Sequence, residues 1–452
     1  MLQRLFRRKF VQDTLALQAG KLGTMFLSAI AALLLYRLMG PTAYGVYAVA
    51  GSFFALWQTL DLTGIGVSTG TRLAMAVGAR DEREILNLMA VYIQIAAFVT
   101  FGLALLVGLF GQPLAVAMHE NAQIGLLAFG LAVANIADTL YGLIIIALQS
   151  RRSMRTLAVF QNANQFILTI CLVAAVIIEP TPESLLIGRL VYSYTTMALA
   201  LYAYTRLRAA GDVPYPPLRA IFARARTVSP RPYWRFGAAN AVDKNLAVLF
   251  TQLPIQLVGA FMGTRAVGYL DLALSAIGYG SILSSAVFDN MAAVVPQMVG
   301  RGDFAGLRRN FMRVLVVLLV GGAALFGALA LFAPFVIPPL LGEEWERAIP
   351  ALMSLSIYGA VTTVGGIFGP LYRALDRVMW AAAAKLIALA VVLPLGYSLL
   401  STASGSAQIN QAEAGALGGA WMINGLFIIS VSLTALFTLP VLRRAAYNRN
   451  DP

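Results

Sequence analysis

The sequence predicts an all-α, polytopic membrane protein with twelve transmembrane helices in two six-helix lobes, parallel pseudo-repeats around a central cavity. Three observations predict this fold: a strongly apolar composition, twelve long apolar runs, and motifs that recur at a constant spacing. Of the 452 residues, 59% are apolar and 12% are charged, whereas soluble chains have roughly 45–50% and about 25%. A chain of this size cannot hide so much apolar surface from water, which excludes a soluble enzyme.

A run of about 20 apolar residues is long enough to span a bilayer as a helix. Twelve such runs are predicted, at residues 14–37, 43–69, 88–111, 121–148, 156–178, 184–205, 237–260, 266–295, 311–337, 348–371, 379–400 and 416–441. The first follows a basic segment, as in a secretory signal peptide. It is too long for a signal peptide and no clear small-residue cleavage motif follows it, so we expect a retained helix.

The basic residues predict the orientation of these helices. With the N-terminus in the cytoplasm, 26 of the 33 Lys and Arg residues fall in cytoplasmic segments, four in outer loops or at helix ends, and three inside helices. Cytoplasmic loops of membrane proteins carry the excess of Lys and Arg. We therefore expect both termini to be cytoplasmic, and we attribute the net charge of +13 to topology rather than to nucleic-acid binding.

Few residues suit metal binding or catalysis. The single cysteine, Cys171, excludes an intrachain disulfide, and the single histidine, His119, excludes a Cys/His zinc site. We expect neither a metal nor a cofactor. The outer loops are short, and their one acidic cluster, Glu343–Glu346, is better interpreted as a solvated helix start than as a catalytic site.

Several motifs recur in order at an offset of 222 or 223 residues. The matching positions are Lys21 and Lys244, Gly40 and Gly263, Gly45 and Gly268, and Asp81 and Asp303. An offset of six helices keeps the same orientation in both halves, so the repeats are parallel. The predicted domains are an N-terminal lobe at 1–205, a cytoplasmic linker at 206–236, a C-terminal lobe at 237–442 and a cytoplasmic tail at 443–452.

The linker contains a short amphipathic helix between proline-rich segments. Its apolar face consists of Leu218, Ile221, Phe222, Ala225 and Val228, and three arginines lie off that face. A basic amphipathic helix on the inner leaflet fits this pattern. An ordinary charged linker fits it equally well.

Three lysines lie inside predicted spans, where an ionised side chain costs roughly 2.5–3.5 kcal/mol on insertion scales. Lys21 and Lys244 are deep and correspond in the repeat, so we expect them to approach each other across a wet cavity and to bind an anion. Lys385 lies less deep and would assist. The alternative is that each lysine pairs locally with a carboxylate, such as Asp138 or Asp243, and only holds helices together.

Acidic and amide side chains complete the candidate site. Asp138 and Asp243 are candidates for cation coupling or for the counter-charge of the lysines. Two polar runs lie in the fifth and seventh spans, and their candidate glycan contacts are Asn162, Gln165, Asn240 and Gln252. Amides that face a cavity can bind sugar hydroxyls, whereas amides between helices hold the helices together. The second interpretation is the default.

The motifs resemble those of a known transporter family. Leu38-Met-Gly-Pro-Thr-Ala-Tyr-Gly-Val-Tyr-Ala48, Leu60-Asp-Leu-Thr-Gly-Ile-Gly66, Val267-Gly-Tyr-Leu-Asp-Leu-Ala273 and Ala412-Glu-Ala-Gly-Ala-Leu-Gly418 are similar to signatures of the polysaccharide transporter family. That family is part of the multidrug/oligosaccharidyl-lipid/polysaccharide (MOP) exporter superfamily. The resemblance covers nearly the whole chain, and the length is typical of an O-antigen or exopolysaccharide repeat-unit flippase.

The resemblance implies a flippase of the bacterial inner membrane and not an enzyme. The implied substrate is an oligosaccharide on undecaprenyl diphosphate, moved from the cytoplasmic to the outer leaflet by alternating access. Lys21, Lys244 and Lys385 would bind the diphosphate. Such flippases often carry cavity arginines, whereas the deep cations expected here are lysines, which bind as point charges. The expected partners are the lipid-linked glycan, membrane lipids and a polysaccharide polymerase, and we expect a monomer.

Three other functions fit the sequence less well. A peptidoglycan-precursor (lipid II-type) flippase would show two extra spans and cavity arginines. A multidrug/cation antiporter would have an acidic cavity, which the deep lysines oppose. A membrane glycosyltransferase or polymerase would need acidic outer loops.

Overall fold

The computed structural model describes residues 2–151, 153–209, 214–375, 377–404 and 410–447. Nearly all of these residues are helical, and no strand occurs among them. The elements in chain order are α1 (Leu2–Gln58), α2 (Ile65–Ala79), α3 (Glu82–His119), α4 (Ala122–Ser150), α5 (Met154–Ile178), α6 (Pro182–Leu207), α7 (Leu218–Ala225), α8 (Arg231–Met262), α9 (Thr264–Arg301), α10 (Phe304–Leu341), η1 (Glu343–Ala348), α11 (Ile349–Gly365), α12 (Phe368–Ala374), α13 (Val378–Ser404) and α14 (Gln411–Tyr447). The predicted all-α class is confirmed.

Helix α1 contains the first predicted span and most of the second. Its backbone breaks at Gly40, with φ 71° and ψ 169°, and Pro41 follows. Glycine adopts this conformation readily because it has no Cβ. Among the described residues, 11 helices are long and apolar enough to cross a membrane, and α1 counts once among them. Divided at Gly40, the apolar part of α1, Gly20–Gln58, gives two arms of about 20 residues. Each arm is long enough for a bilayer, and the spans of the described residues then number twelve.

The second predicted span, 43–69, is wrong at its end, because the helix stops earlier. α1 ends at Gln58, and α2 begins only at Ile65. Between them the Asp61 carboxylate accepts hydrogen bonds from the backbone N–H and the hydroxyl of Thr63, at 2.9 and 2.5 Å. Gly64 then takes a left-handed conformation, with φ 54°. An Asp side chain that bonds the backbone two residues later forms a turn in place of a helix.

The turns formed by the repeated motifs confirm the internal repeat. Gly263 has φ 82° and ψ 171°, nearly the conformation of Gly40. In the next loops, Arg80 and Gly302 are both left-handed, and Asp81 and Asp303 follow them as N-caps. These caps begin α3 and α10, which both have 38 residues. Corresponding residues therefore build corresponding turns.

The chain forms two compact units. Unit 1 comprises Met1–Leu38 and Phe53–Val242, and unit 2 comprises Met39–Ser52 and Asp243–Pro452. Helices α1 and α8 contribute residues to both units. The predicted lobes divide the chain once, in the linker, whereas the structure assigns the short segment Met39–Ser52 to the unit that contains the second half of the chain.

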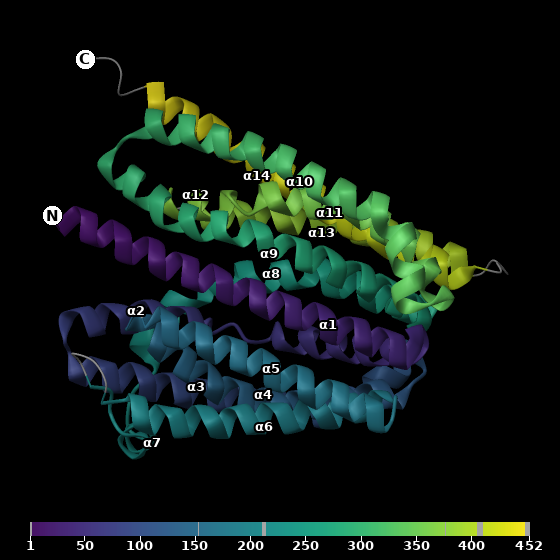
Figure 1. The fold of residues 1–452 in the computed structure, drawn as a ribbon, viewed down its shortest axis with the longest axis horizontal. Helices are drawn as coiled ribbons and strands as arrows, with labels where there is room; N and C mark the ends of the chain where they lie inside the picture. Colours follow the sequence, from purple (N-terminus) through teal and green to yellow (C-terminus); the bar gives the residue numbers. More distant parts are fainter. Residues whose placement is uncertain (1, 152, 210–213, 376, 405–409, 448–452) are drawn as a thin grey trace. The chain divides into compact units, whose positions relative to one another are not determined.

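Unit 1 contains a helical bundle in which α3 packs on α4, α4 on α6, and α5 on α6 (Figure 1). Its core gathers Leu88 and Met89 of α3 with Ile144 of α4 and Tyr204 of α6, all of them buried. Helix α5 contributes little to this core, because most of its side chains stay half-buried or exposed. Figure 1 shows α7 at one end of the bundle, beside α3.

The apolar face of the linker helix α7 packs on protein. Ile221 and Ala225 are buried in the same core cluster as Ile85 and Leu88 of α3. Arg224 Nε donates to Asn87 Oδ1 at 2.8 Å. Because α3 covers most of the apolar face of α7, little of that face is left to bind the inner leaflet. The contact therefore disfavours the interpretation of this segment as a helix on the membrane surface.

The linker is also tied to the ends of α4 and α6. The Arg151 guanidinium lies 3.7 Å from the centroid of the Tyr215 ring and donates to the carbonyl oxygens of Leu207 and Arg208 at 3.0 and 2.8 Å. Burial raises the pKa of the Tyr215 phenol. The phenol therefore stays protonated and donates to the Ala147 carbonyl at 2.9 Å.

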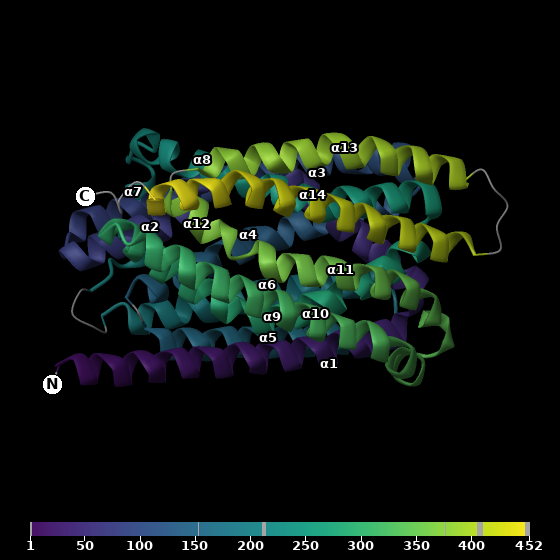
Figure 2. The same cartoon turned by 90° about the horizontal axis from the view of Figure 1, so that it is seen from above.

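Unit 2 is a second helical bundle, in which α10 packs on α11, α13 on α14, and α11 on both α14 and α9 (Figure 2). Phe311 and Phe368 meet edge to face in its core, with ring centroids 5.3 Å apart. The Asn424 amide of α14 donates to the backbone and hydroxyl oxygens of Ser354 on α11, at 2.9 and 3.0 Å. Such bonds between helices replace the hydrophobic effect, which does not drive helix association in lipid.

Within unit 2, the two repeated glycine motifs contact each other. Gly45 lies against the backbone of Thr264, and Gly268 lies against the backbone of Pro41. Two further bonds join the same segments: Gln256 Nε2 donates to the Val49 carbonyl, and the Ser52 hydroxyl donates to the Gln252 carbonyl. The reciprocal contact explains why the segment Met39–Ser52 belongs to unit 2.

We expect alanine at Gly45 or Gly268 to destabilise the protein strongly. The added methyl group would lie 1.9 Å from the Thr264 carbonyl oxygen or 2.1 Å from that of Pro41. Overpacking typically costs about 1–3 kcal/mol and sometimes more. The measurement is thermal unfolding in detergent, followed by size-exclusion chromatography. Gly51→Ala is the matched control, because a methyl group there meets nothing within 4 Å; equal stability of Gly45→Ala and this control would contradict the prediction.

Candidate functional site

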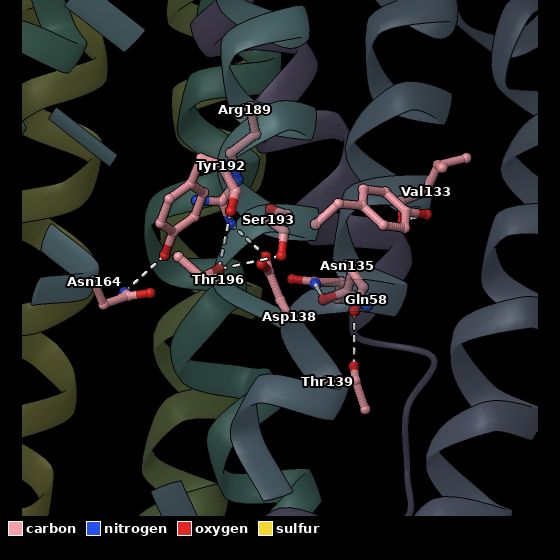
Figure 3. Close-up of polar contacts among 11 residues, drawn as sticks. Gln58, Val133, Asn135, Asp138, Thr139, Asn164, Arg189, Tyr192, Ser193 and Thr196 are labelled. Carbon is pink, nitrogen blue, oxygen red and sulfur yellow. Dashed lines mark hydrogen bonds and ion pairs between the residues drawn. The ribbon is translucent and has the colours of Figure 1, made fainter. Parts of the chain in front are cut away.

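An ion pair joins two membrane helices of unit 1. Arg189 Nη2 on α6 lies 2.5 Å from Asp138 Oδ2 on α4, and the two side chains are 28% and 26% exposed (Figure 3). Asp138 is one of the predicted counter-charge residues, and its partner is an arginine rather than one of the lysines. Arg189 lies seven residues after Pro182, about 10 Å into its helix at 1.5 Å per residue. Arg189 is one of the four basic residues that the predicted topology assigns to outer loops or helix ends, so its place inside the helix was not predicted.

Hydroxyl and amide groups surround this ion pair. Asn164 Nδ2 on α5 donates to the Tyr192 hydroxyl at 2.7 Å, and the Arg189 guanidinium lies 4.9 Å from the centroid of the Tyr192 ring. We call Asp138, Arg189, Tyr192, Asn164 and Ser193 the unit 1 polar cluster. Figure 3 shows all five of these side chains together, on α4, α5 and α6.

Some polar atoms of the unit 1 polar cluster have no partner within the described chain. Asn164 Oδ1 and Ser193 Oγ are buried without a hydrogen bond, and so is the hydroxyl of Tyr141, one turn after Asp138 on α4. A buried unsatisfied polar group costs about 1–3 kcal/mol. Water or the hydroxyl groups of a ligand would supply the missing bonds.

A second ion pair lies in unit 2. Lys385 Nζ on α13 donates to Asp243 Oδ1 on α8 at 2.6 Å and to the Asp243 carbonyl at 3.0 Å. The side chains of Lys385 and Asp243 are 15% and 21% exposed. An ammonium group has three donors, and two of them bind Asp243. Two of the predicted site residues are thus brought together directly.

Lys385 also lines a cavity of about 270 Å³ within unit 2. Its wall combines the hydroxyl-bearing residues Tyr372, Ser430 and Thr434 with aromatic rings, including Phe427. The rings of Phe427 and Phe250 meet edge to face, with centroids 5.1 Å apart. Aromatic faces, hydroxyl groups and one cation can together contact a polar ring and an anion.

The other two predicted lysines lie in different units. Lys21 is half-buried on the unit 1 part of α1, and Lys244 is exposed on the unit 2 part of α8. Lys244 directly follows Asp243, and successive residues of a helix point about 100° apart, so it faces away from the Lys385 pair. The approach of the two lysines across the halves stays a prediction.

The predicted glycan contacts have different surroundings. Asn162 Nδ2 donates to the Ala158 carbonyl of its own helix at 2.8 Å, and Gln252 Nε2 donates to the Thr251 hydroxyl at 3.2 Å. Gln165 is half-buried on α5. The side chain of Asn240 lies outside the described residues. No group of three or more His, Cys, Asp or Glu residues that could hold a metal occurs in the described ranges.

A family model described as polysaccharide biosynthesis protein matches residues 34–350, more than half of the chain. The chain belongs to this family. The matched region contains both copies of the glycine motif and both members of the Asp138–Arg189 pair. The resemblance predicted from the motifs is therefore confirmed at the level of the polysaccharide biosynthesis family.

The chain is similar to the lipopolysaccharide biosynthesis protein WzxC of Escherichia coli (strain K12), to which it is 30% identical over 156 residues. That alignment covers 33% of this polysaccharide biosynthesis protein and 30% of the relative's length.

Two solved structures show the same fold over almost the whole chain. An inward-facing multidrug resistance MATE family transporter of the MOP superfamily is 13% identical, with a TM-score of 0.73 over 95% of this chain and 98% of that one. A MOP superfamily transporter from Pyrococcus furiosus, described as having a binding pocket of reverse polarity, is 12% identical, with a TM-score of 0.66 over 96% of each chain. This polysaccharide biosynthesis protein thus has the fold of the MOP superfamily.

Proposed function

We propose that this protein is a flippase for a lipid-linked oligosaccharide in polysaccharide biosynthesis. It moves a short glycan on undecaprenyl diphosphate from the cytoplasmic to the outer leaflet of the bacterial inner membrane, by alternating access and without covalent chemistry. Both termini lie in the cytoplasm, and the protein acts as a monomer that hands its product to a polysaccharide polymerase. The name of the Escherichia coli relative supports a role in building surface glycans.

The observation that carries this proposal is the presence of basic side chains on spanning helices of both units. Arg189 and Lys385 are each held by a carboxylate, and Lys244 is exposed. A charge inside the membrane is expensive and marks a substrate or ion path. A diphosphate needs such cations, because an unpaired anion would not enter the apolar core.

The carboxylates have a defined part in this mechanism. Asp243 holds Lys385 while the site is empty, and it can be exchanged for a phosphate oxygen when substrate arrives. In unit 1, Asp138 does the same for Arg189. Each exchange keeps the cation paired, and the released carboxylate must then be hydrated or take up a proton.

Polar side chains would receive the glycan. The open hydrogen-bonding groups of Asn164 and Ser193 lie in unit 1, and the hydroxyl groups around Lys385 lie in unit 2. Asn162, Gln165, Asn240 and Gln252 stay the proposed additional contacts. These groups replace water around the sugar hydroxyls, while the lipid chain stays in the bilayer.

The paired carboxylates argue against a multidrug/cation antiporter. Such a transporter needs a carboxylate that can attract a cation, whereas Asp138 and Asp243 are each neutralised by a basic partner. The likeness to the MATE transporters, at 13% identity, extends to the fold alone. A lipid II-type flippase stays the main alternative function. The two functions differ in which lipid-linked glycan the protein accepts as substrate.

Loss of surface glycan in lysine variants tests the proposal. In a strain that lacks its own flippase, the wild-type chain should restore the glycan, and Lys21→Ala/Lys244→Ala should reduce it at least tenfold at equal membrane expression. Arg309→Ala is the matched control, since it removes an exposed charge at the start of α10. Undiminished glycan in the double variant would contradict the assignment of these lysines.

A further inference from the structure

Unit 1 has a groove between α1 and α5 that the proposed exchange of ion pairs does not use. The groove has a volume of about 700 Å³, and its walls include Gly20 and Leu27 of α1 and Arg155, Val159, Asn162 and Phe166 of α5. All of these residues belong to unit 1. Neither member of the Asp138–Arg189 pair lines it.

Asn162 lines the groove and lies in close contact with α1. A methyl group on Gly20 would lie 3.1 Å from Asn162 Nδ2, and one on Gly23 would lie 2.9 Å from Asn162 Oδ1. The amide is held in place by its bond to the Ala158 carbonyl. The two glycines let α1 lie directly on the amide of α5.

The α5 wall is a mostly apolar strip that includes the Asn162 amide and has a cation at one end. Positions 155, 159, 162 and 166 follow the spacing of a single helix face, and they extend over about 16 Å at 1.5 Å per residue. Val159 and Phe166 are 67% and 54% exposed on a helix apolar enough to span a membrane. Arg155 is exposed in the first turn of that helix.

The strip suits one hydrocarbon chain with an anionic head. Exposed Val, Leu and Phe side chains are unfavourable in water and are covered by hydrocarbon in a bilayer. An arginine fork binds phosphate oxygens in a bidentate manner. The two features together favour a single-chain lipid phosphate, because the strip is only one helix face wide and the Arg155 guanidinium stands at its end.

We propose that this groove binds the polyisoprenoid diphosphate part of the substrate, with the diphosphate on Arg155 and the first isoprene units along Val159, Leu27 and Phe166. The proposal rests on the proposed function and adds a docking site for the lipid at the Arg155 end of α5. The lipid docks here first, and its diphosphate then passes to the cations of the proposed ion-pair exchange.

Photolabelling of the full-length protein in lipid nanodiscs tests the groove. The probe is a benzophenone-bearing polyisoprenoid diphosphate, and labelled peptides are located by mass spectrometry. We expect labelling of α1 and α5, and about a tenfold loss of labelling in Arg155→Gln, the effect of one charged hydrogen-bonding partner. Val159→Trp, which fills the groove from an exposed position, should cause a similar loss.

Two matched variants and one competitor complete the design. Arg309→Gln removes an exposed charge elsewhere, and Ile178→Trp adds the same ring at the opposite, 85% exposed end of α5; both should label as the wild type does. Unlabelled undecaprenyl diphosphate should compete, and phosphatidylglycerol should not. Equal competition by phosphatidylglycerol, or full labelling of Arg155→Gln and Val159→Trp, would overturn the proposal.

Flipping by the same protein variants in proteoliposomes separates this inference from the proposed function. If the wild type flips the glycolipid and the groove variants label and flip normally, the lipid site is contradicted and the proposed flippase function stands. If the wild type is labelled in the groove but does not flip the glycolipid, the proposed function is contradicted and the lipid site stands.

Discussion

Asp138→Asn is expected to lower the free energy of unfolding by about 1–3 kcal/mol, because breaking a half-buried ion pair leaves one charge uncompensated. In Asp138→Asn the Arg189 guanidinium would stay between α4 and α6 with no carboxylate at 2.5 Å. Arg189→Gln should have a similar effect, because it leaves Asp138 as an unpaired anion. The measurement is unfolding of the purified protein by denaturant in detergent micelles.

The double variant Asp138→Asn/Arg189→Gln separates the charge from the shape of the site. Both side chains are then neutral and can hydrogen-bond to each other, so most of the lost stability should return. Replacing both members of a buried pair is often nearly neutral, whereas removing one is not. Additive losses in the double variant would show that the two residues stabilise the protein separately, contrary to this account.

Replacing Lys385 with glutamine is expected to reduce transport at least tenfold. Lys385 is the cation on the wall of the unit 2 cavity, and its removal leaves the Asp243 carboxylate there without its partner. An uncompensated negative charge would repel a diphosphate as well as destabilise the fold. Restoration of surface glycan at matched expression, together with thermal unfolding, measures the two effects.

Asp243→Asn/Lys385→Gln is the informative companion of this variant. It should recover the stability that Lys385→Gln loses, since no charge is left unpaired, and it should still fail to restore transport. Such a result would assign Lys385 to the substrate and Asp243 to its counter-charge. Normal transport by the neutral double variant would instead show that the pair only holds α8 against α13.

Most of the helices could be predicted because hydropathy alone locates a membrane span. The repeat could also be predicted, because Gly40 and Gly263 need a backbone conformation that glycine tolerates best, and Asp81 and Asp303 both cap helices. The end of the second span could not be predicted from hydropathy. The turn there depends on the hydrogen bonds that the Asp61 carboxylate accepts from Thr63 and on the left-handed Gly64.

The site was harder to predict than the fold, because charge pairs depend on which helices are neighbours. Asp243 was expected either to pair with a lysine or to couple a cation, and its contact with Lys385 required α8 and α13 to be adjacent. Arg189 was assigned to a helix end because it follows an outer loop closely. A count of residues from Pro182 would have placed it two turns into the helix, at a depth where an arginine needs a partner.

The central claim is that basic side chains on spanning helices carry a lipid diphosphate across the bilayer. Its most direct test is leaflet exchange of a fluorescent undecaprenyl-diphosphate oligosaccharide in proteoliposomes, measured by a membrane-impermeant quencher and followed by mass analysis of the recovered lipid. We predict faster exchange than in protein-free vesicles, an unchanged lipid mass, and at least tenfold slower exchange with Lys21→Ala/Lys244→Ala. Exchange at the protein-free rate, or at the same rate in the double variant, would contradict the account.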